Sequence, residues 1–210
     1  MVKVYYTYFN EQLKEPILTS YLGLLPEEMQ QRIARFRSWQ DAQASLLGKL
    51  LLSRGLSDLG LSYQLSEIKY TTYGRPYFNN GIDFNISHSG GCIACAFISS
   101  GKIGIDIEEV RPIGIEDFRS IFHEEEWSDI NTSNCTEHTF FHYWTTKEAI
   151  VKAEGTGLNI PLKKILVKSE QSVLNDMAWY HQSISLYDNY MVKIASDRKL
   201  TDIQSIHLSF

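Results

Sequence analysis

The sequence predicts an α+β fold in two halves, and three observations carry that prediction. Helix-like and strand-like segments are mixed in each half of the chain, and the strands suit mostly antiparallel pairing. The run Ser99-Ser100-Gly101 is a turn-forming segment close to the middle of the sequence. The chain has 210 residues, 43% of them apolar, enough to fill one large core or two small ones. We therefore expect one half over residues 1–100 and a second over residues 101–210.

The first half is predicted to combine helices with short strands. A strand-like run begins at Val2 and continues to about Phe9. Pro26 suits the first turn of one helix, and a second helix, from about Asp41 to Leu59, has a leucine stripe on one face and can end at Gly60. Further strands are expected at Ile68–Thr72, Pro76–Phe78 and Cys92–Ile98.

The second half is predicted to hold a long helix and most of the remaining strands. A strand is expected from about Lys102 to Glu108, a helix around Ile115–Ile130, and a long helix from about Thr136 to Glu154. The residues Tyr187-Asp188-Asn189 are typical of a hairpin turn. The other strands are expected at Ile165–Lys168, Ser183–Tyr187, Tyr190–Ala195 and Ile203–Phe210.

Charge and hydropathy argue against two classes of partner. A net charge of −5 disfavours a protein whose main work is coating DNA or RNA, so any anionic ligand needs a local basic patch. No apolar run approaches the ~18 residues of a membrane span, and Met1 to Tyr6 resembles a strand and not a signal segment. We expect a cytoplasmic monomer with no nucleic-acid or membrane partner.

The three cysteines do not look like a disulfide framework, because their number is odd in a chain of this length. Cys92 and Cys95 have the spacing of a redox or zinc pair. However, they lie in an apolar strand, where residues three apart point to opposite faces, and no second cysteine pair completes a zinc set. We expect buried structural thiols.

Two carboxylates project side by side from the strand that opens the second half. Ile103, Ile105 and Ile107 share one face of this strand, and Gly104, Asp106 and Glu108 share the other. Like charges so close repel each other, which favours a cation, a proton or a basic group between them. Oxygen ligands with room for phosphates suit Mg²⁺ or Mn²⁺ better than zinc. The alternative is an exposed strand face with solvated acids.

The long helix carries a second charged stripe. Trp144, Glu148 and Lys152 follow one another at a spacing of four residues, and Lys147 lies about 100° around the axis from Glu148. A solvated ion pair would explain Glu148 and Lys152, but a stripe that begins at a large aromatic is expected to be partly buried. We interpret Glu148 as a third metal ligand, with the lysines facing phosphate oxygens.

The segment from Asn85 to Gly91 offers hydroxyls, an imidazole and glycine-freed backbone N–H groups. It reads Asn-Ile-Ser-His-Ser-Gly-Gly, and a turn of this composition can bind an anion through its backbone amides. A serine nucleophile with His88 as its base is the competing interpretation, although adjacent residues rarely reach that geometry and no G-x-S-x-G elbow is present. A third possibility is turn chemistry alone.

Taken together, these segments resemble the 4′-phosphopantetheinyl transferases, specifically their larger, surfactin-synthetase-activating class. Three motifs of that family occur in order along the chain. They are Gly74-Arg75-Pro76 leading to Phe84-Asn85-Ile86-Ser87-His88-Ser89-Gly90, then Gly104-Ile105-Asp106-Ile107-Glu108, then Trp144-Thr145-Thr146-Lys147-Glu148-Ala149 with Lys152, Gly155 and Gly157-Leu158. With the weaker matches at Pro26-Glu27 and Leu46-Leu47-Gly48, the resemblance spans nearly the whole chain.

The resemblance implies two similar halves related by a pseudo-twofold axis, with the active site in the cleft between them. It also implies transfer of the phosphopantetheine arm of coenzyme A to a serine of an apo-acyl or peptidyl carrier protein, with release of 3′,5′-ADP. Asp106, Glu108 and Glu148 would bind Mg²⁺, and Lys147 and Lys152 would hold phosphate oxygens. The residues that would contact coenzyme A are Arg75, Pro76, Ser87, His88 and Ser89.

The implied catalytic residues are Asp106, Glu148 and Lys152, with Lys152 stabilising the departing ADP and Glu148 or a metal-bound water acting as the base. The sequence departs from the family pattern at the position that would bind the 3′-phosphate of coenzyme A. The resemblance implies a basic residue just before Leu46, but Gln43, Ala44 and Ser45 stand there. A degenerate relative that only binds a carrier protein or nucleotide, or a metal-dependent phosphohydrolase, is the alternative.

Overall fold

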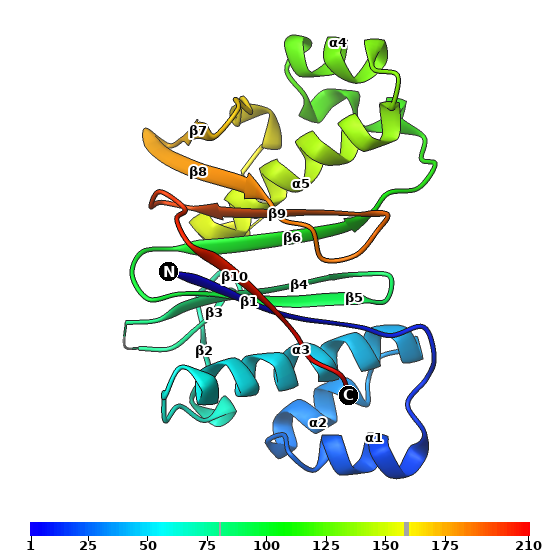
Figure 1. Cartoon of the computed structure of the whole chain (residues 1–210), viewed down its shortest axis with the longest axis vertical. Helices are drawn as coiled ribbons and strands as arrows, with labels where there is room; N and C mark the ends of the chain where they lie inside the picture. Colours follow the sequence, from blue (N-terminus) through cyan, green and yellow to red (C-terminus); the bar gives the residue numbers. More distant parts are fainter. Residues whose placement is uncertain (80, 158–159) are drawn as a thin grey trace.

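The computed structural model of the chain describes residues 1–79, 81–157 and 160–210. Two sheets lie against each other at its centre, and helices cover the outer face of each (Figure 1). Helices and mostly antiparallel strands are mixed in both halves, so the predicted α+β class is confirmed. Among the residues described, no helix is long and apolar enough to cross a membrane.

The first sheet has the strand order β10-β1-β5-β4, and a two-stranded ribbon, β2-β3, lies beside it. The helix α3 crosses the face of the sheet with Leu46, Leu47 and Leu51 in the core. It begins at Ser38, whose hydroxyl accepts a hydrogen bond from the backbone N–H of Asp41. The elements of this half are β1 (Val2–Tyr8), α1 (Glu15–Leu22), α2 (Glu27–Ile33), α3 (Trp39–Asp58), β2 (Lys69–Tyr70), β3 (Pro76–Tyr77), β4 (Asp83–Ser89) and β5 (Cys92–Ile98).

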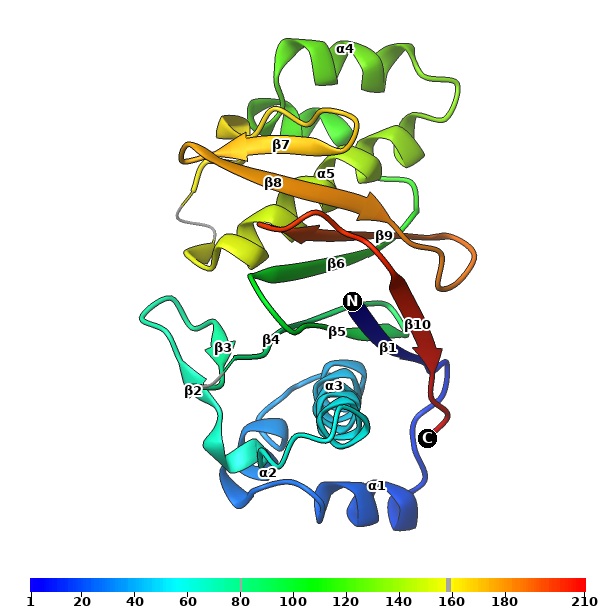
Figure 2. The same cartoon turned by 60° about the vertical axis from the view of Figure 1, so that its left-hand side comes forward.

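The second sheet has the order β6-β9-β8-β7, and α5 packs along it (Figure 2). Gly104 lets α5 approach β6 closely, because a Cβ at that position would overlap the carbonyl oxygen of Ala149. The helix ends at Gly155, which adopts the left-handed conformation that favours glycine. The elements are β6 (Ile103–Glu109), α4 (Glu124–Thr132), α5 (Thr136–Glu154), β7 (Gln171–Leu174), β8 (Met177–Ser183), β9 (Tyr190–Ser196) and β10 (Ile203–His207).

The last strand, β10, leaves the second half and completes the first sheet (Figure 1). It pairs in parallel with β1, with Val2 opposite Ile203. Leu208 and Phe210 continue onto the hydrophobic core of the first half. The two halves are therefore joined by chain crossing as well as by packing.

The strand β5 is buried on both faces, which explains its unbroken apolar sequence. Cys95 points into the core beneath α3, and Cys92 points into the layer between the two sheets. Burial raises the pKa of Cys92 to about 12, so this thiol stays protonated. Both residues are buried structural thiols, as expected from their spacing on a strand.

Several predicted elements differ from the structure, mainly where short segments depend on tertiary contacts. The helix predicted around Ile115–Ile130 is divided into a 3-10 turn, Ile115–Ile121, and α4. The segment Ile165–Lys168 is not a strand as predicted, and of Ser183–Tyr187 only Ser183 is in a strand, at the end of β8. The residues that pair are those of β7 and β8. The helix α1 was not predicted, although Leu18, Tyr21 and Leu22 have the spacing of one helix face and pack against the first core.

Candidate active site at the junction of the two halves

The predicted acids meet at the contact between β6 and α5. Asp106 is buried, Glu108 lies at the end of β6, and Glu148 is half-buried on α5. Burial raises the pKa of Glu148 to about 7, and the negative charges of Asp106 and Glu108 add to the effect. Burial likewise raises the pKa of Asp106 to about 6, although Lys152 opposes the shift. The three carboxylates are therefore near enough to one another for their charges to interact.

Lys152 carries the positive charge of this site. Its ammonium group donates to Asp106 Oδ1 at 2.5 Å and to Ser87 Oγ at 2.9 Å. The second oxygen of the same carboxylate, Asp106 Oδ2, is buried and has no hydrogen-bond partner. A buried carboxylate oxygen without a partner is costly unless a further cation or donor satisfies it.

Glu108 is oriented by two donors from different elements. The indole N–H of Trp144 on α5 donates to Glu108 Oε1 at 3.0 Å. The hydroxyl of Ser89 on β4 donates to Glu108 Oε2 at 3.0 Å. The predicted stripe of Trp144, Glu148 and Lys152 therefore does face the acids of β6.

A polar edge ladder, formed by Asp83, Asn85, Ser87 and Ser89 of β4, connects the two sheets. These side chains accept hydrogen bonds from every second backbone N–H group along the free edge of β6. The donor residues, in order, are Ile103, Ile105, Ile107 and Glu109, at 2.7, 2.9, 3.3 and 3.2 Å. The ladder satisfies an edge that would otherwise be buried unpaired. It also fixes where Asp106 and Glu108 stand relative to β4.

The sequence did not lead us to predict the polar edge ladder, although the residue pattern of β4 contains a signal for it. Ser87 and Ser89 were interpreted as part of a turn, but both lie in β4. Their hydroxyls bind β6 as well as the acids Asp106 and Glu108. The alternation of polar side chains with Phe84 and Ile86 has strand periodicity and could have revealed a strand with one polar face.

Arg75 joins the halves, and its side chain is bonded within the protein where the resemblance implied a contact with coenzyme A. Its guanidinium pairs with both oxygens of Asp83, at 2.8 and 2.7 Å. It also donates to the backbone carbonyls of Lys152, at 2.9 Å, and Ile103, at 2.8 Å. These bonds take up most of its donors. Arg75 therefore acts here as a structural link, while Pro76 lies half-buried in β3.

The prediction that Lys147 holds phosphate oxygens needs correction. Its side chain is fully buried and forms a salt bridge with Glu126 of α4 at 2.8 Å. The ammonium group also donates to the backbone carbonyls of Leu162 and Ile165. Lys147 is rotated by about 100° around the axis of α5 from Glu148, so its side chain points into the protein interior, where these partners lie. Lys147 therefore stabilises the fold, and its ammonium group is bonded away from Asp106, Glu108 and Glu148.

His88 and the glycines after it border a surface pocket of about 420 Å³. His88 is exposed on β4, and its lining partners include Tyr8, Trp39, Ala44 and Tyr190. Gly90 has a positive φ, and a Cβ there would come within 2.7 Å of the Tyr190 hydroxyl. The predicted Leu158 of the third motif lies outside the described residues.

The carboxylates of Asp106, Glu108 and Glu148 have some, but not all, of the features of a binding site for a hard cation. Within residues 1–79, 81–157 and 160–210, no group of three or more His, Cys, Asp or Glu side chains is arranged so that it could hold a metal ion. The open oxygen of Asp106 and the charge repulsion among the three carboxylates nevertheless favour a bound cation. Oxygen-only donors are typical of Mg²⁺, which usually keeps part of its shell for water and phosphate.

Comparison with known proteins finds matches over most of the chain. A family profile described as "4′-phosphopantetheinyl transferase, N-terminal" covers residues 14–99, and that of the 4′-phosphopantetheinyl transferase superfamily covers residues 102–199. The 4′-phosphopantetheinyl transferase Sfp of Bacillus subtilis is 36% identical over 81% of this chain and 78% of its own. The chain belongs to the 4′-phosphopantetheinyl transferase superfamily.

A second curated relative also supports membership of this superfamily. The 4′-phosphopantetheinyl transferase gsp of Aneurinibacillus migulanus is 31% identical, over 82% of this chain and 73% of its own. Among solved structures, the holo-[acyl-carrier-protein] synthase of Thermotoga maritima is 21% identical, with a TM-score of 0.36 over 47% of this chain and 64% of that one. As a superfamily member, the chain is an enzyme, a 4′-phosphopantetheinyl transferase.

Proposed function

We propose that this enzyme transfers the 4′-phosphopantetheine arm of coenzyme A to a serine hydroxyl of an apo-acyl or peptidyl carrier protein. The products are the holo-carrier protein and adenosine 3′,5′-bisphosphate, and the reaction depends on Mg²⁺, with Mn²⁺ as a substitute. The observation that carries the proposal is the buried Asp106, which has one oxygen on Lys152 and the other without a partner. That arrangement occurs in a chain of the phosphopantetheinyl transferase superfamily.

In the proposed reaction, the carrier's serine oxygen attacks the phosphorus that bears the pantetheine arm. A new P–O bond forms to serine, the pyrophosphate P–O bond breaks, and the leaving group departs as adenosine 3′,5′-bisphosphate. The nucleophile belongs to the carrier, so the enzyme needs alignment and charge stabilisation more than a nucleophile of its own. This explains why no serine–histidine or cysteine–histidine dyad is required at the site.

The residues of the junction have separate roles in this scheme. Asp106, Glu108 and Glu148 would hold Mg²⁺, which when bound neutralises charge on the pyrophosphate oxygens. Lys152 can move its ammonium group from Asp106 to the departing phosphate, because its side chain is only partly buried. Glu148, half-buried beside Asp106, is the carboxylate placed to take the serine proton.

The proposal is tested by measuring the intact mass of several purified apo-carriers after incubation with the enzyme, coenzyme A and Mg²⁺. We expect the phosphopantetheine increment on at least one carrier, with bisphosphate release only when that carrier is present. Release without carrier would indicate a phosphohydrolase instead. No release with any carrier would indicate a protein that only binds.

The metal assignment has its own test. Asp106→Asn is expected to lower the transfer rate by about 100-fold or more, while the exposed turn variant Asp188→Asn keeps full activity. Chelation with EDTA should stop transfer, and added Mg²⁺ should restore it. Undiminished transfer in EDTA, or by Asp106→Asn, would contradict the assignment.

A further inference from the structure

The last turn of α5 carries Lys152 and is closed by side chains from outside the helix. The final four backbone carbonyls of a helix have no partner within it, so the last turn frays easily. In α5, the carbonyl of Lys152 accepts a hydrogen bond from Arg75 Nε at 2.9 Å, and that of Glu154 accepts one from Lys102 Nζ at 3.1 Å. Both donors are cations, which the negative end of the helix dipole attracts. The turn is therefore held by groups that are distant from it in the sequence or outside the helix.

Arg75 is fixed at both ends, whereas Lys102 is exposed. The guanidinium of Arg75 pairs with both oxygens of Asp83 at 2.8 and 2.7 Å, and the side chains of this pair are only 13% exposed. Its backbone N–H donates to Thr71 Oγ1 at 3.1 Å, and its carbonyl accepts from the N–H of Thr71 at 2.9 Å. Arg75 therefore holds the carbonyl of Lys152 at a defined place relative to β4, the strand of Asp83.

The residue that follows α5 leaves space for this side chain. Gly155 has a φ of 95°, and a Cβ at that position would come within 2.8 Å of Arg75 Cδ. The glycine thus ends the helix and also lets the guanidinium approach the carbonyl of Lys152. The contact between Arg75 and the helix end is therefore built into both segments.

The side chain of Lys152 is held by the same strand as its carbonyl. Its ammonium group donates to Ser87 Oγ at 2.9 Å and to Asp106 Oδ1 at 2.5 Å. Ser87 and Asp83 both belong to β4. β4 thus determines the position of the ammonium group through Ser87 and that of the backbone through Asp83 and Arg75. A shift of the last turn of α5 relative to β4 would move the ammonium group away from the acids.

We propose that Arg75 is a positioning residue for the transfer reaction, which fixes the Lys152 ammonium group beside the leaving group by holding the last turn of α5. This inference rests on the function proposed above, in which Lys152 stabilises the departing bisphosphate. Arg75 does not act on coenzyme A directly, because four of its five N–H donors are occupied by acceptors of the protein. Its role therefore differs from the contact with coenzyme A that the resemblance implied.

Kinetics and calorimetry separate these two roles of Arg75. In Arg75→Met, we expect kcat at saturating coenzyme A to fall about 10- to 100-fold, since a misplacement of about 1 Å in a catalytic group can cost that much. The KM for coenzyme A, and its Kd measured without carrier protein, should stay within about 2-fold of the wild-type values. A side chain that binds coenzyme A would instead weaken binding and leave kcat nearly unchanged, which would overturn the proposal.

A double-mutant cycle tests whether Arg75 acts through Lys152. Lys152→Met removes the ammonium group, so a residue that only positions this group should have no further effect. Adding Arg75→Met to Lys152→Met is therefore expected to change kcat by less than about 2-fold. If the two effects multiply, Arg75 acts by another route and the positioning role is wrong.

Two further variants guard against a simple loss of fold. Arg75→Met leaves Asp83 without its counter-ion, which lowers stability. Arg75→Lys keeps a cation beside Asp83, but a single ammonium group cannot bind Asp83 and the carbonyl of Lys152 as the planar guanidinium does. We expect Arg75→Lys to melt near the wild-type temperature and still to lose most of kcat. Lys102→Met removes the exposed cation at the carbonyl of Glu154 and should keep kcat within about 2-fold.

Hydrogen exchange provides a readout that does not depend on turnover. Backbone amides of residues 150–157 should exchange faster in Arg75→Met and Arg75→Lys than in the wild type, while those of α3 stay unchanged. Unchanged exchange in the last turn of α5, or wild-type kcat in Arg75→Met, would overturn the positioning role and leave the transferase function standing. If the wild type transfers to no carrier, the proposed function fails and the positioning role fails with it.

Discussion

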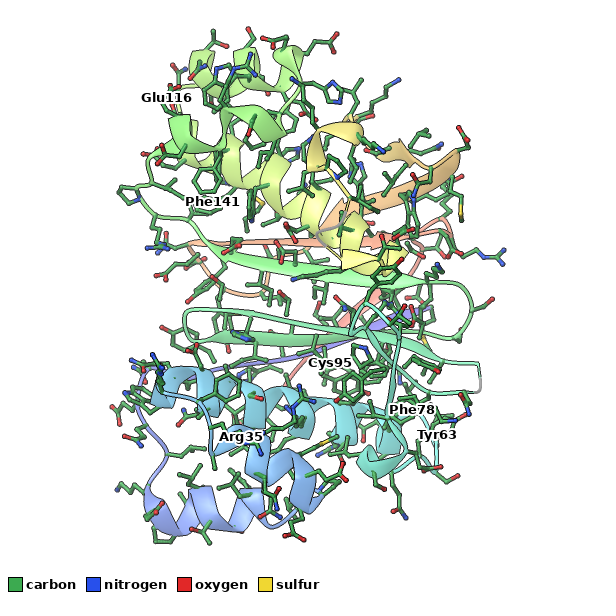
Figure 3. All side chains as sticks on the ribbon, turned by 180° about the vertical axis from the view of Figure 1, so that it is seen from behind. Arg35, Tyr63, Phe78, Cys95, Glu116 and Phe141 are labelled. Carbon is green, nitrogen blue, oxygen red and sulfur yellow. The ribbon has the colours of Figure 1, made fainter. Side chains whose placement is uncertain are left out.

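Lys147 and Lys152 lie on the same helix, and their surroundings are opposite. Lys147 is fully buried and neutralised by Glu126, whereas Lys152 is partly open and bonded to Asp106 and Ser87. The five-residue spacing rotates the two side chains to different sides of α5. Figure 3 draws the side chains of this helix, with Phe141 labelled. One lysine therefore serves the fold and the other the proposed site.

Replacing Lys147 tests the structural role. Lys147→Met leaves Glu126 buried without its counter-ion, and we expect the free energy of unfolding to fall by about 3–5 kcal/mol. Urea denaturation measures the loss. Adding Glu126→Gln removes the unpaired charge and should recover part of it. A loss below about 1 kcal/mol in the single variant would show that the pair contributes little.

Lys193, which lies opposite Asp106 in the pairing of β6 with β9, gives a pH-dependent prediction about stability. Burial lowers the pKa of Lys193 from its usual 10.5 to about 8, while burial also lowers the pKa of its neighbours His142 and His181 to about 4, so these stay neutral above pH 7. Lys193 binds its proton less tightly in the folded chain than in the unfolded chain. Protonated Lys193 therefore destabilises the fold by the full amount below pH 8, and this effect disappears as the pH rises through 10.5.

Lys193→Met is accordingly expected to stabilise the protein at pH 7, by at most about 3 kcal/mol. The gain over the wild type should shrink between pH 8 and pH 10, which thermal melts across that range can follow. Lys199→Met, at an exposed position, should show no such trend. A gain that is independent of pH would mean that the effect comes from packing and not from the ammonium group.

At the scale of elements, the site depends on how closely α5 approaches β6. Gly104 permits that approach, since a Cβ there would overlap the backbone of Ala149 and Ala153. The same close contact brings Glu148 of α5 beside Asp106 of β6. On the other edge of β6, the polar edge ladder holds β4. The acids are thus positioned from both sides by backbone contacts.

Gly104→Ala should separate α5 from β6. We expect a loss of about 1–3 kcal/mol in the free energy of unfolding from overpacking. We also expect transfer activity to fall further than the unfolded fraction explains, because Glu148 moves relative to Asp106. Gly114→Ala is the matched control, as a Cβ there meets only Asp117 at 3.7 Å and should change stability by less than about 0.5 kcal/mol. Equal effects of the two substitutions would refute the close-approach argument.

Much of this arrangement was predictable from local sequence patterns, and the rest depended on contacts distant in sequence. Strand alternation correctly placed Gly104, Asp106 and Glu108 on one face, and helical spacing correctly aligned Trp144 with Glu148 and Lys152. Periodicity places a side chain on a face but does not identify its partner. The pairing of Lys147 with Glu126, of Arg75 with Asp83, and of the polar edge ladder with β6 therefore could not be predicted.

At the scale of the whole molecule, the two halves are held together by a chain crossing, by the apolar layer between the sheets and by polar contacts. Arg75 binds Asp83 of the first half and the backbone carbonyls of Ile103 and Lys152 in the second. The strand β10 returns from the second half to pair with β1 (Figure 2). Because the acids lie at the junction, these links preserve the site as well as the fold.

Deletion of residues 203–210 tests the contribution of β10. The deletion exposes the hydrogen-bonding edge of β1 and removes the apolar cover given by Ile206, Leu208 and Phe210 to the first core. We expect the melting temperature to fall by about 10 °C or more, since about 1 kcal/mol corresponds to about 2–4 °C in a chain of this size. The freed edge should also promote aggregation, measurable by light scattering.

A full-length variant with Gln204→Ala and His207→Ala separates the strand from its exposed side chains. It keeps the backbone pairing and the buried residues, because both positions are exposed. Its melting temperature should stay within a few degrees of the wild type. If the deletion behaved like this control, β10 would be a passive end of the chain, and the two halves would be held together by the apolar layer between the sheets and by the junction of β4, β6 and Arg75.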